Sequence, residues 1–207
     1  MAKNKSNKAW MQQHVTDPYV KRAAAEGMRS RAAYKLMQIN DKDKLLKPGM
    51  VVVDLGATPG GWSQVAAKQV APAGRVIAID LLEMQGLGGV TFIQGDFSAD
   101  AGLAAVEKAL AGAPVDLVLS DMAPNISGIS QVDQARLVGL VELALDFAAK
   151  HLKPQGNFLV KVFHGAGFDE FVAAMRSVFV QVQSRKPEAS RKGSREVYLL
   201  GKDLKKP

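Results

Sequence analysis

Residues 51–63 read Val-Val-Val-Asp-Leu-Gly-Ala-Thr-Pro-Gly-Gly-Trp-Ser, an apolar run followed by a glycine-rich turn. The β-branched run predicts a strand that is buried on both faces. Gly60 and Gly61 permit backbone conformations that other residues avoid, and a helical pattern resumes after them. A strand, a tight turn and a helix in this order open nucleotide-cofactor folds, in which the ligand lies beyond the carboxyl ends of parallel strands. We therefore interpret this turn as part of a cofactor site.

The spacing of the glycines narrows the class of cofactor. Gly56, Gly60 and Gly61 give the pattern G-x-x-x-G-G, which is neither the dinucleotide fingerprint nor the Walker phosphate loop. Asp54, near the end of the strand, is suited to ordering the loop or to contacting a cationic group of a ligand. S-adenosylmethionine carries an ammonium, a sulfonium and no phosphate, so it fits better than a dinucleotide. A strand-to-helix turn without any ligand is the alternative.

The length of 207 residues and the ordinary composition predict a globular protein with one sizeable core. We expect a basic arm with a first helix at residues 1–29 and a single domain at residues 30–207. The sequence contains no cysteine, which excludes disulfides and thiolate metal sites, and its three scattered histidines suggest no metal cluster. No apolar run is long enough to span a membrane, and the polar start lacks a secretory signal. We therefore expect a cytoplasmic protein, and we expect a monomer.

The charges are divided unevenly along the chain. Residues 1–50 hold 11 Lys or Arg and 4 Asp or Glu, and residues 176–207 hold 9 and 3, so both ends are basic. Residues 51–175 hold 7 basic and 13 acidic residues. Basic segments supply most of the non-specific affinity for nucleic acid, so we expect the two ends to contact a polyanion, with Trp10 stacking on a base. Solvated surface charge is the alternative for the ends, and disorder is the alternative for Trp10.

Apolar runs alternate with helical patterns through most of the chain. Beyond the first strand, we expect strands at 75–80, 90–96, 115–121, 157–163, 179–182 and 196–200. We expect helices at 19–28, 32–39, 63–70, 99–112, 137–151 and 168–178, and a basic loop at 186–193. Asp17 and Ser30 are expected to cap the first two helices. The alternation predicts an α/β, Rossmann-like fold with a mostly parallel, doubly wound sheet and an antiparallel C-terminal hairpin, as in class I methyltransferases that use S-adenosylmethionine.

Charged residues stand at or near the ends of several predicted strands. Asp80 ends the second strand, where an acid commonly binds the ribose hydroxyls of a cofactor. Asp96 is placed to accept a hydrogen bond from an adenine amino group, with a simple turn-forming role as the alternative. Asp121 ends the fourth strand, and Lys161 interrupts an apolar strand. A lysine in such a place is costly unless it is paired or has a function.

Four charged residues fall where one pocket can collect them, namely Lys35, Asp121, Lys161 and Glu196. Together with four motifs they closely resemble the FtsJ/RrmJ family of ribosomal RNA 2′-O-methyltransferases. The motifs are Asp54-Leu-Gly-Ala-Thr-Pro-Gly-Gly-Trp-Ser63, Ser120-Asp-Met-Ala-Pro-Asn125, Leu159-Val-Lys-Val-Phe163 and Ser194-Arg-Glu-Val-Tyr198. The resemblance extends from about residue 30 to about residue 200. Thr58 is a mild departure, because a small residue such as Ala is expected there.

The resemblance implies both a function and a set of site residues. The implied function is 2′-O-methylation of a uridine ribose in 23S ribosomal RNA, with S-adenosylmethionine as methyl donor and the assembled large ribosomal subunit as substrate. Lys35, Asp121, Lys161 and Glu196 would form the catalytic tetrad, with Lys161 as the commonly assigned proton acceptor. Cofactor contacts are implied for Gly60, Trp62, Asp80, Asp96 and Asp121. A plain core position is the alternative for Trp62, with only its backbone at the cofactor.

The residues themselves leave other interpretations open. Lys161 can serve as a base only when it is neutral, which burial and Lys35 favour and which Asp121 and Glu196 oppose. A charged Lys161 would instead stabilise a developing alkoxide. A non-catalytic RNA-binding or ribosome-assembly protein on the same fold would need only the basic ends. A nicotinamide dehydrogenase shares the sheet and the acid at Asp80, but its glycine fingerprint is absent.

Overall fold

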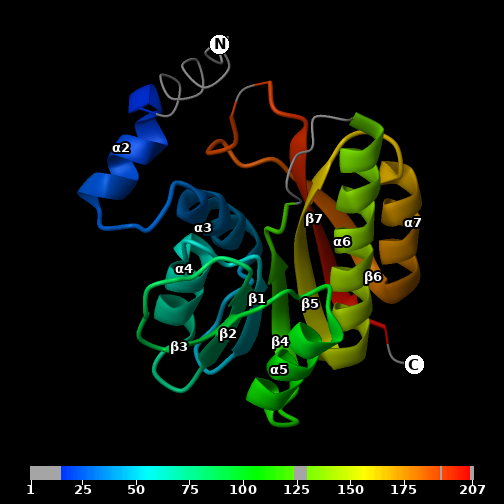
Figure 1. Ribbon diagram of the computed structural model, residues 1–207, viewed down its shortest axis with the longest axis horizontal. Coiled ribbons are helices and arrows are strands. Elements are labelled where there is room, and N and C mark those ends of the chain that lie inside the picture. The colour runs from blue at the N-terminus through cyan, green and yellow to red at the C-terminus, as the bar shows by residue number, and fades with distance from the viewer. Residues whose placement is uncertain (1–14, 124–129, 192, 206–207) are drawn as a thin grey trace, which may run out of the picture.

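The structure, a computed structural model, describes residues 15–123, 130–191 and 193–205. Within these ranges, one seven-stranded sheet with the order β3-β2-β1-β4-β5-β7-β6 forms the centre of the molecule (Figure 1). The strands are β1 (Val51–Leu55), β2 (Arg75–Asp80), β3 (Val90–Gln94), β4 (Val115–Ser120), β5 (Leu152–Phe163), β6 (Phe179–Arg185) and β7 (Glu196–Leu204). Strands β1 to β5 are parallel, and β7 is antiparallel to both of its neighbours. The predicted fold class is confirmed.

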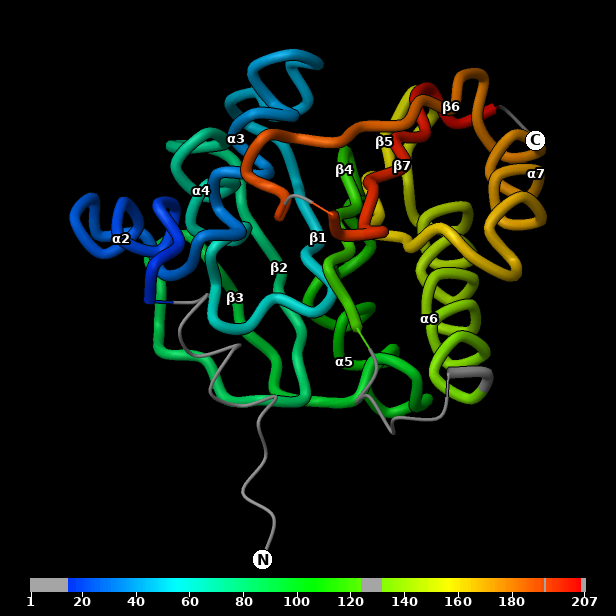
Figure 2. The backbone as a smooth tube through the Cα atoms, turned by 90° about the horizontal axis from the view of Figure 1, so that it is seen from above, coloured from blue at the N-terminus to red at the C-terminus, as the bar shows by residue number. Residues whose placement is uncertain are grey.

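Helices cover both faces of this sheet. The helices in the described ranges are α2 (Pro18–Ala25), α3 (Ala32–Asp43), α4 (Gly61–Val70), α5 (Asp100–Leu110), α6 (Ser130–His151) and α7 (Phe168–Val178). Helices α3 and α4 pack on one face, and α5, α6 and α7 pack on the other. Figures 1 and 2 show α2 at the outer edge of the molecule, away from the sheet. None of the helices in the described ranges is long and apolar enough to cross a membrane.

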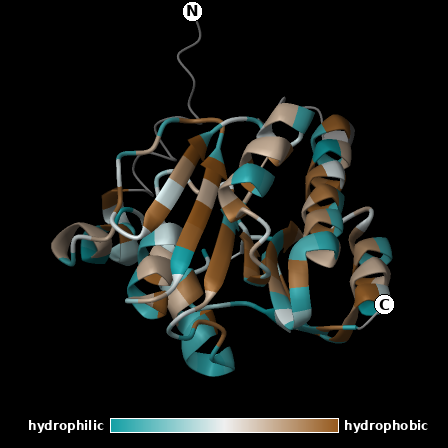
Figure 3. Cartoon of the chain, turned by 90° about the horizontal axis from the view of Figure 1, so that it is seen from below, coloured by the Kyte–Doolittle hydropathy of each residue, from teal (hydrophilic) through white to brown (hydrophobic). Residues whose placement is uncertain are grey.

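The apolar strands follow from this layered arrangement, because successive side chains of a strand point to opposite faces. In β1, Val53 and Leu55 pack with α5, α6 and α7, whereas Val52 packs with α3 and α4. A strand that is covered on both sides needs no polar alternation. Figure 3 shows the result, with apolar strands at the centre and hydrophilic residues on the outward sides of helices.

The two helix caps predicted near the N-terminus have different outcomes. Asp17 caps α2 as predicted, because its side chain accepts a hydrogen bond of 2.9 Å from the main-chain nitrogen of Tyr19. The prediction for Ser30 was wrong: Arg31, already in helical conformation, precedes α3 without a side-chain cap. The hydroxyl of Ser30 is buried without a hydrogen-bond partner and fills the space beside Gly61. Tertiary packing against the glycine turn has therefore replaced a local capping bond.

Helix α6 and the strand that follows it, β5, are longer than predicted. Helix α6 begins at Ser130 rather than at residue 137, and β5 begins at Leu152, directly after it. Residues 153–156, which lie between the helix predicted at 137–151 and the strand predicted at 157–163, are an irregular part of β5, whose register with β4 shifts between Val115 and Leu117. The added turns of α6 are mostly polar, so their sequence carries little apolar periodicity, which is the main signal for a helix.

Several predictions concern residues that lie outside the described ranges. Trp10 and most of the basic arm are among them, and so are Pro124, Asn125 and Lys192. The predicted boundary between residues 29 and 30 stays a prediction. The described part of the arm is joined to the domain, because Asp17 lies 2.8 Å from Arg31 Nη1 and 3.8 Å from Arg191 Nε. This ion cluster links α2 to the basic loop that precedes β7.

The connections of the strands place a ligand site between β1 and β4. From this point β1 leads outward to β2 on one side, and β4 leads outward to β5 on the other. Ligands of such sheets bind at this switch point, beyond the carboxyl ends of the strands. The main-chain nitrogen of Asp121 donates to Leu55 O at 3.0 Å, so the two strand ends lie side by side. Gly56 follows β1 with a φ of +77°, and a Cβ there would lie 2.8 Å from the Cα of Met122, so only glycine fits.

A buried carboxylate at the end of α3 leads to the first prediction. Asp43, whose side chain is 3% exposed, lies 2.6 Å from Arg185 and 2.7 Å from Lys202. The hydrogen bond from Arg185, assisted by Lys202, lowers the pKa of Asp43 from 3.8 to about 2, although burial opposes this. Because the folded pKa is the lower one, the stabilisation is complete above the unfolded value and is lost as the pH falls toward 2.

We expect Asp43→Ala to lower the free energy of unfolding at pH 7 by about 3 kcal/mol, because it leaves two partly buried cations without their buried partner. Urea unfolding at pH 7 and at pH 2.5 measures this, and the difference from the wild type should shrink at the lower pH. Lys42→Ala, at an exposed neighbouring position, serves as the control. An equal loss at both pH values would contradict the electrostatic origin of the effect.

Candidate active site

Lys161 is buried in β5 and is held by Asp121, the residue that follows β4. Its Nζ lies 3.0 Å from Asp121 Oδ1 and donates a hydrogen bond of 2.6 Å to the main-chain oxygen of the same residue. The contact with Oδ1 lacks hydrogen-bond geometry and is an ion pair only. The side chain of Lys161 is 9% exposed, and an unpaired cation at such a depth would be strongly destabilising. Asp121 therefore neutralises Lys161 and fixes the position of its amino group.

A second ion pair joins α3 to the start of β7. Lys35 Nζ lies 2.7 Å from Glu196 Oε1 and also donates to the hydroxyl of Tyr198 at 3.0 Å. The Tyr198 hydroxyl donates to Glu196 Oε1 at 3.1 Å, and Ser190 Oγ donates to the same oxygen at 3.2 Å. Glu196 is thus the point at which α3, β7 and the basic loop meet.

The pairing of β5 with β7 brings the two ion pairs to one face of the sheet. Lys161 lies opposite Tyr198, and Phe163 lies opposite Glu196. Residues two apart in a strand share a face, so Lys161, Tyr198 and Glu196 point to the same side. All four residues of the predicted tetrad, Lys35 included, are therefore brought together. Their catalytic roles stay a prediction.

The charges of this group influence one another. Burial raises the pKa of Glu196, but Lys35 and Lys161 outweigh this effect, and the pKa lies below its ordinary value. Glu196 is therefore an ionised acceptor at neutral pH. Burial raises the pKa of Tyr198 well above its ordinary value, and Asp121 and Glu196 act in the same direction. Its hydroxyl therefore stays protonated and bridges Lys35 to Glu196.

A cavity of about 350 Å³ lies at the switch point beside Asp121. It is lined by the ends of the strands, by the loops that follow them and by Leu140 of α6. Four of the predicted cofactor contacts line it, namely Gly56, Asp80, Asp96 and Asp121. Apolar residues alternate with these acids in the wall, which suits a ligand with an apolar ring and several hydroxyl groups. The described residues contain no group of three or more His, Asp or Glu side chains that could hold a metal ion.

Asp80 and Asp96 are oriented by the loops that carry them. Asp80 accepts from the main-chain nitrogens of Thr58 at 2.9 Å and Leu82 at 2.8 Å. Asp96 Oδ1 accepts from the hydroxyl and the main-chain nitrogen of Ser98, and these bonds lower the pKa of Asp96. The turn-forming role weighed for Asp96 is therefore present. Carboxylate oxygens accept more than one hydrogen bond, so both acids can also bind a ligand.

The sequence matches the family described as FtsJ-like methyltransferase over residues 28–204. The chain belongs to this family. It is 63% identical over 205 residues to the ribosomal RNA large subunit methyltransferase E of Azoarcus sp. (strain BH72), covering 99% of this chain and 100% of that one. The protein of the same name from Methylobacillus flagellatus is 62% identical, with 97% of each chain covered. A crystal structure described as a ribosomal RNA methyltransferase from Plasmodium falciparum has a TM-score of 0.76 and 28% identity, covering 85% of this chain and 98% of that one.

In this member of the FtsJ-like family, the second half of the glycine turn is closely covered by protein. Gly60 has a φ of +102°, and a Cβ there would lie 2.8 Å from Met84 Sδ and 2.9 Å from Arg29 Nη1. A Cβ at Gly61 would meet the hydroxyl of Ser30. The two glycines thus make room for neighbouring residues. Cofactor contacts from their backbone stay a prediction.

Trp62 occupies a core position. It is 2% exposed, and its indole nitrogen donates to Ala32 O at 2.9 Å. Its ring lies 5.6 Å from the ring of Tyr198, measured between centroids. Its side chain therefore links α4 to α3 and β7, as the core alternative proposed. A contact between its backbone and the cofactor stays a prediction.

Asp54 fits a ligand with a cationic or N–H group. It is fully buried, and its Oδ2 accepts a hydrogen bond of 2.6 Å from Ser63 Oγ. Its Oδ1 is buried without a hydrogen-bond partner. Burial raises the pKa of Asp54 to about 7. A buried oxygen that lacks a hydrogen-bond partner is stabilised by any donor that reaches it.

The raised pKa of Asp54 leads to a second prediction. The folded state keeps the proton up to about pH 7, whereas the unfolded state ionises near 3.8, so stability falls as the pH rises between these values. We expect the wild type to lose about 2 kcal/mol between pH 5 and pH 8 that Asp54→Asn does not lose. Urea unfolding of both proteins at both pH values measures this difference. Parallel pH dependences in the two proteins would refute the assignment.

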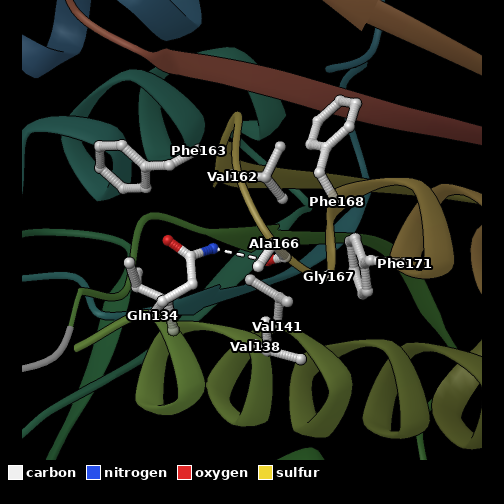
Figure 4. Close-up of a pocket in the computed structure, with 10 residues that line it drawn as sticks. Gln134, Val138, Val141, Val162, Phe163, Ala166, Gly167, Phe168 and Phe171 are labelled. Atoms are coloured by element: carbon white, nitrogen blue, oxygen red, sulfur yellow. Dashed lines mark hydrogen bonds between the residues drawn. The ribbon is translucent and has the colours of Figure 1, made fainter. Parts of the chain in front are cut away.

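A second hollow lies between α6 and the segment that joins β5 to α7 (Figure 4). Gln134 reaches across it and donates to Ala166 O at 2.8 Å. The remaining wall is mainly apolar, with Val138, Val141 and Phe171 among its residues. Its volume of about 20 Å³ has room for about one water molecule and is far too small for a cofactor or substrate, so we assign it no ligand.

Sequence reasoning missed two members of the polar group around Glu196. Tyr198 stands two residues after Glu196 in the predicted final strand, and this spacing alone places both side chains on one face. That signal was sufficient to find it. Ser190 lies in the basic loop, where no periodicity relates it to the sheet, so only the folded chain shows its contact with Glu196.

Proposed function

We propose that this protein transfers a methyl group from S-adenosylmethionine to the 2′-hydroxyl of a uridine in large-subunit ribosomal RNA. The observation that carries the proposal is the buried amino group of Lys161, held by Asp121 beside a cavity at the switch point. Membership of the FtsJ-like methyltransferase family and the names of the two relatives support it. The choice of a uridine as the target and the choice of the assembled subunit as the substrate are the most detailed elements of the proposal.

The cavity at the switch point would hold the methyl donor, and the chain offers partners for several of its polar groups. Asp80 would hold ribose hydroxyls, and Asp96 would accept from the adenine amino group. A contact between the ammonium group and the free oxygen of Asp54, which is buried and does not line this cavity, stays a prediction. When bound, S-adenosylmethionine supplies a methyl group attached to a sulfonium, and the neutral thioether that remains after transfer is a good leaving group.

In this proposal, the four tetrad residues assist the attack of the ribose 2′-hydroxyl, which is a weak nucleophile. A ribose hydroxyl is poorly nucleophilic near neutral pH, so transfer needs in-line placement and a group that removes or offsets its proton. Two oxygens of Asp121 surround Lys161 Nζ and fix its position. As an ammonium group, Lys161 would stabilise negative charge on the ribose oxygen while the proton leaves to solvent. As a neutral amine, it would accept that proton at Nζ.

The basic ends supply the affinity for RNA in this proposal. The loop that carries Lys186 and Arg191 also carries Ser190, which donates to Glu196, so positive charge lies beside the tetrad. Neutralisation of phosphates by such residues gives binding that weakens with salt. All four tetrad residues come from one chain, so we propose a monomer. A ribosomal substrate would place the protein in the cytoplasm.

Purified protein, tritiated S-adenosylmethionine and large ribosomal subunits from a strain that lacks the protein test the proposal. We expect label in the RNA, at one uridine, and faster labelling of the assembled subunit than of free ribosomal RNA. Nuclease digestion of the product locates the label, and alkali resistance of the adjacent linkage shows that the 2′-oxygen carries it. Labelling of a base, or of no RNA, would overturn the proposal.

Neither rival interpretation has support from the site or the comparisons. A non-catalytic assembly protein needs no buried ion pairs beside a cofactor cavity, and such pairs stabilise a fold weakly at best. A nicotinamide dehydrogenase would bind a pyrophosphate at the glycine turn, and this chain belongs to a methyltransferase family instead.

A further inference from the structure

The guanidinium of Arg29 joins two loops that border the cofactor cavity. Its Nη1 donates to Gln85 O at 2.7 Å and more weakly to Pro59 O at 3.4 Å, and its Nη2 donates to Gly86 O at 2.6 Å. Pro59 belongs to the glycine turn after β1, whereas the other two carbonyls belong to the loop after β2. One side chain from the segment between α2 and α3 thus bonds to three main-chain oxygens of two separate loops.

The loop after β2, residues 81–89, depends on such contacts because it contains no helix or strand. Its first two residues line the cofactor cavity. Thr58 Oγ1 donates to Leu82 O at 3.0 Å, and Met84 packs into an apolar cluster beneath the loop. Arg29 holds the part beyond Met84. The position of the loop 81–89 is therefore set by Thr58 and Met84 near its start and by Arg29 further along.

Arg29 is itself held in place. Its main-chain nitrogen donates to Gln64 Oε1 at 2.9 Å, and Gln64 Nε2 donates to Gly27 O at 2.9 Å. Gly60 leaves open the space that the guanidinium fills, since a Cβ there would lie 2.9 Å from Nη1. Arg29 is not among the residues that line the cofactor cavity. Any effect on a bound donor must therefore pass through the loop.

We propose that Arg29 is a positioning residue that sets the affinity of the cavity for the methyl donor. The proposal rests on the proposed function, because it takes this cavity as the donor site. Without the guanidinium, the loop samples arrangements that do not bind, and the apparent affinity falls in proportion to the fraction of time that the loop keeps its binding arrangement. The rate at saturating donor is unaffected, because Arg29 does not touch the reacting groups.

The test measures binding of S-adenosylhomocysteine, the demethylated donor, by calorimetry, which needs no RNA. We expect Arg29→Ala to raise its Kd about 10-fold, because charged hydrogen bonds that preorganise the loop are lost. Arg29→Lys keeps the charge but lacks the planar fork that reaches several carbonyls, so we expect a rise of about 3-fold or more. Lys68→Ala, which removes an exposed charge in α4, is the matched control and should leave Kd unchanged.

Kinetics separate positioning from a general loss of structure. We expect Arg29→Ala to raise the KM for the donor by about the same factor as Kd, with kcat unchanged, whereas partial unfolding would lower kcat. If Arg29→Ala does not fold, Arg29→Lys carries the test. Wild-type affinity in both Arg29 variants, or full rescue by lysine, would overturn the proposal. Failure of the wild type to bind S-adenosylhomocysteine would instead refute the proposed function, and this proposal with it.

Discussion

Lys161→Ala is expected to abolish methyl transfer while leaving donor binding close to normal. The change removes the only charged side chain that the strand β5 directs toward Asp121, about 3 Å away in the wild type. Loss of a group that offsets charge or accepts a proton in the transition state lowers the rate by about 10³-fold. Single-turnover labelling of large ribosomal subunits at saturating donor measures this rate. Calorimetry with S-adenosylhomocysteine shows whether the cofactor cavity is intact.

The Lys161→Ala variant leaves the carboxylate of Asp121 without its partner, so it needs controls for folding. Asp121 is partly buried, so removing its partner destabilises the fold, and thermal unfolding must confirm that the variant is folded. Lys153→Ala removes a half-exposed lysine from the same strand and should retain wild-type activity. Full activity of a folded Lys161→Ala would refute the assignment of Lys161, whereas equal losses of donor binding and rate would indicate a damaged cavity.

Asp80→Ala is expected to raise the Kd for S-adenosylhomocysteine about 100-fold, the second large effect, because charge-assisted hydrogen bonds are worth about 1.5–3 kcal/mol each. In the structure the carboxylate holds the loop after β1 through Thr58 and the loop after β2 through Leu82. In the proposed function it also binds the ribose of the donor. Both losses act on binding, so calorimetry is the direct measurement.

Two further variants separate these contributions. Asp80→Asn keeps one carbonyl oxygen as an acceptor for a main-chain nitrogen, so we expect an affinity between those of the wild type and Asp80→Ala. Glu83→Ala removes an exposed acid from the same loop and controls for net charge. An unchanged Kd in Asp80→Ala would show that the donor does not occupy this cavity, which would also remove the basis for the role of Arg29.

Some residues of the site could be predicted from local sequence, and others could not. The acids at Asp80, Asp96 and Asp121 were predictable, because the end of a strand can be read from local sequence and parallel strands end at one edge. The partners within the tetrad were not. Lys161 pairs with Asp121 across neighbouring strands, and Lys35 pairs with Glu196, which is 161 positions away in the chain.

The sequence by itself determined the order of strands and helices, the buried character of the sheet and the place of the ligand site, because each depends on patterns within about ten consecutive residues. It also determined that Lys161 needs a partner, from the apolar residues on either side of it. Only the tertiary structure decided which charges meet, that Ser30 packs on Gly61 instead of capping α3, and that Arg29 joins two loops that border the cavity at the switch point. Contacts between distant segments depend on how helices pack on the sheet, and no local periodicity records that geometry.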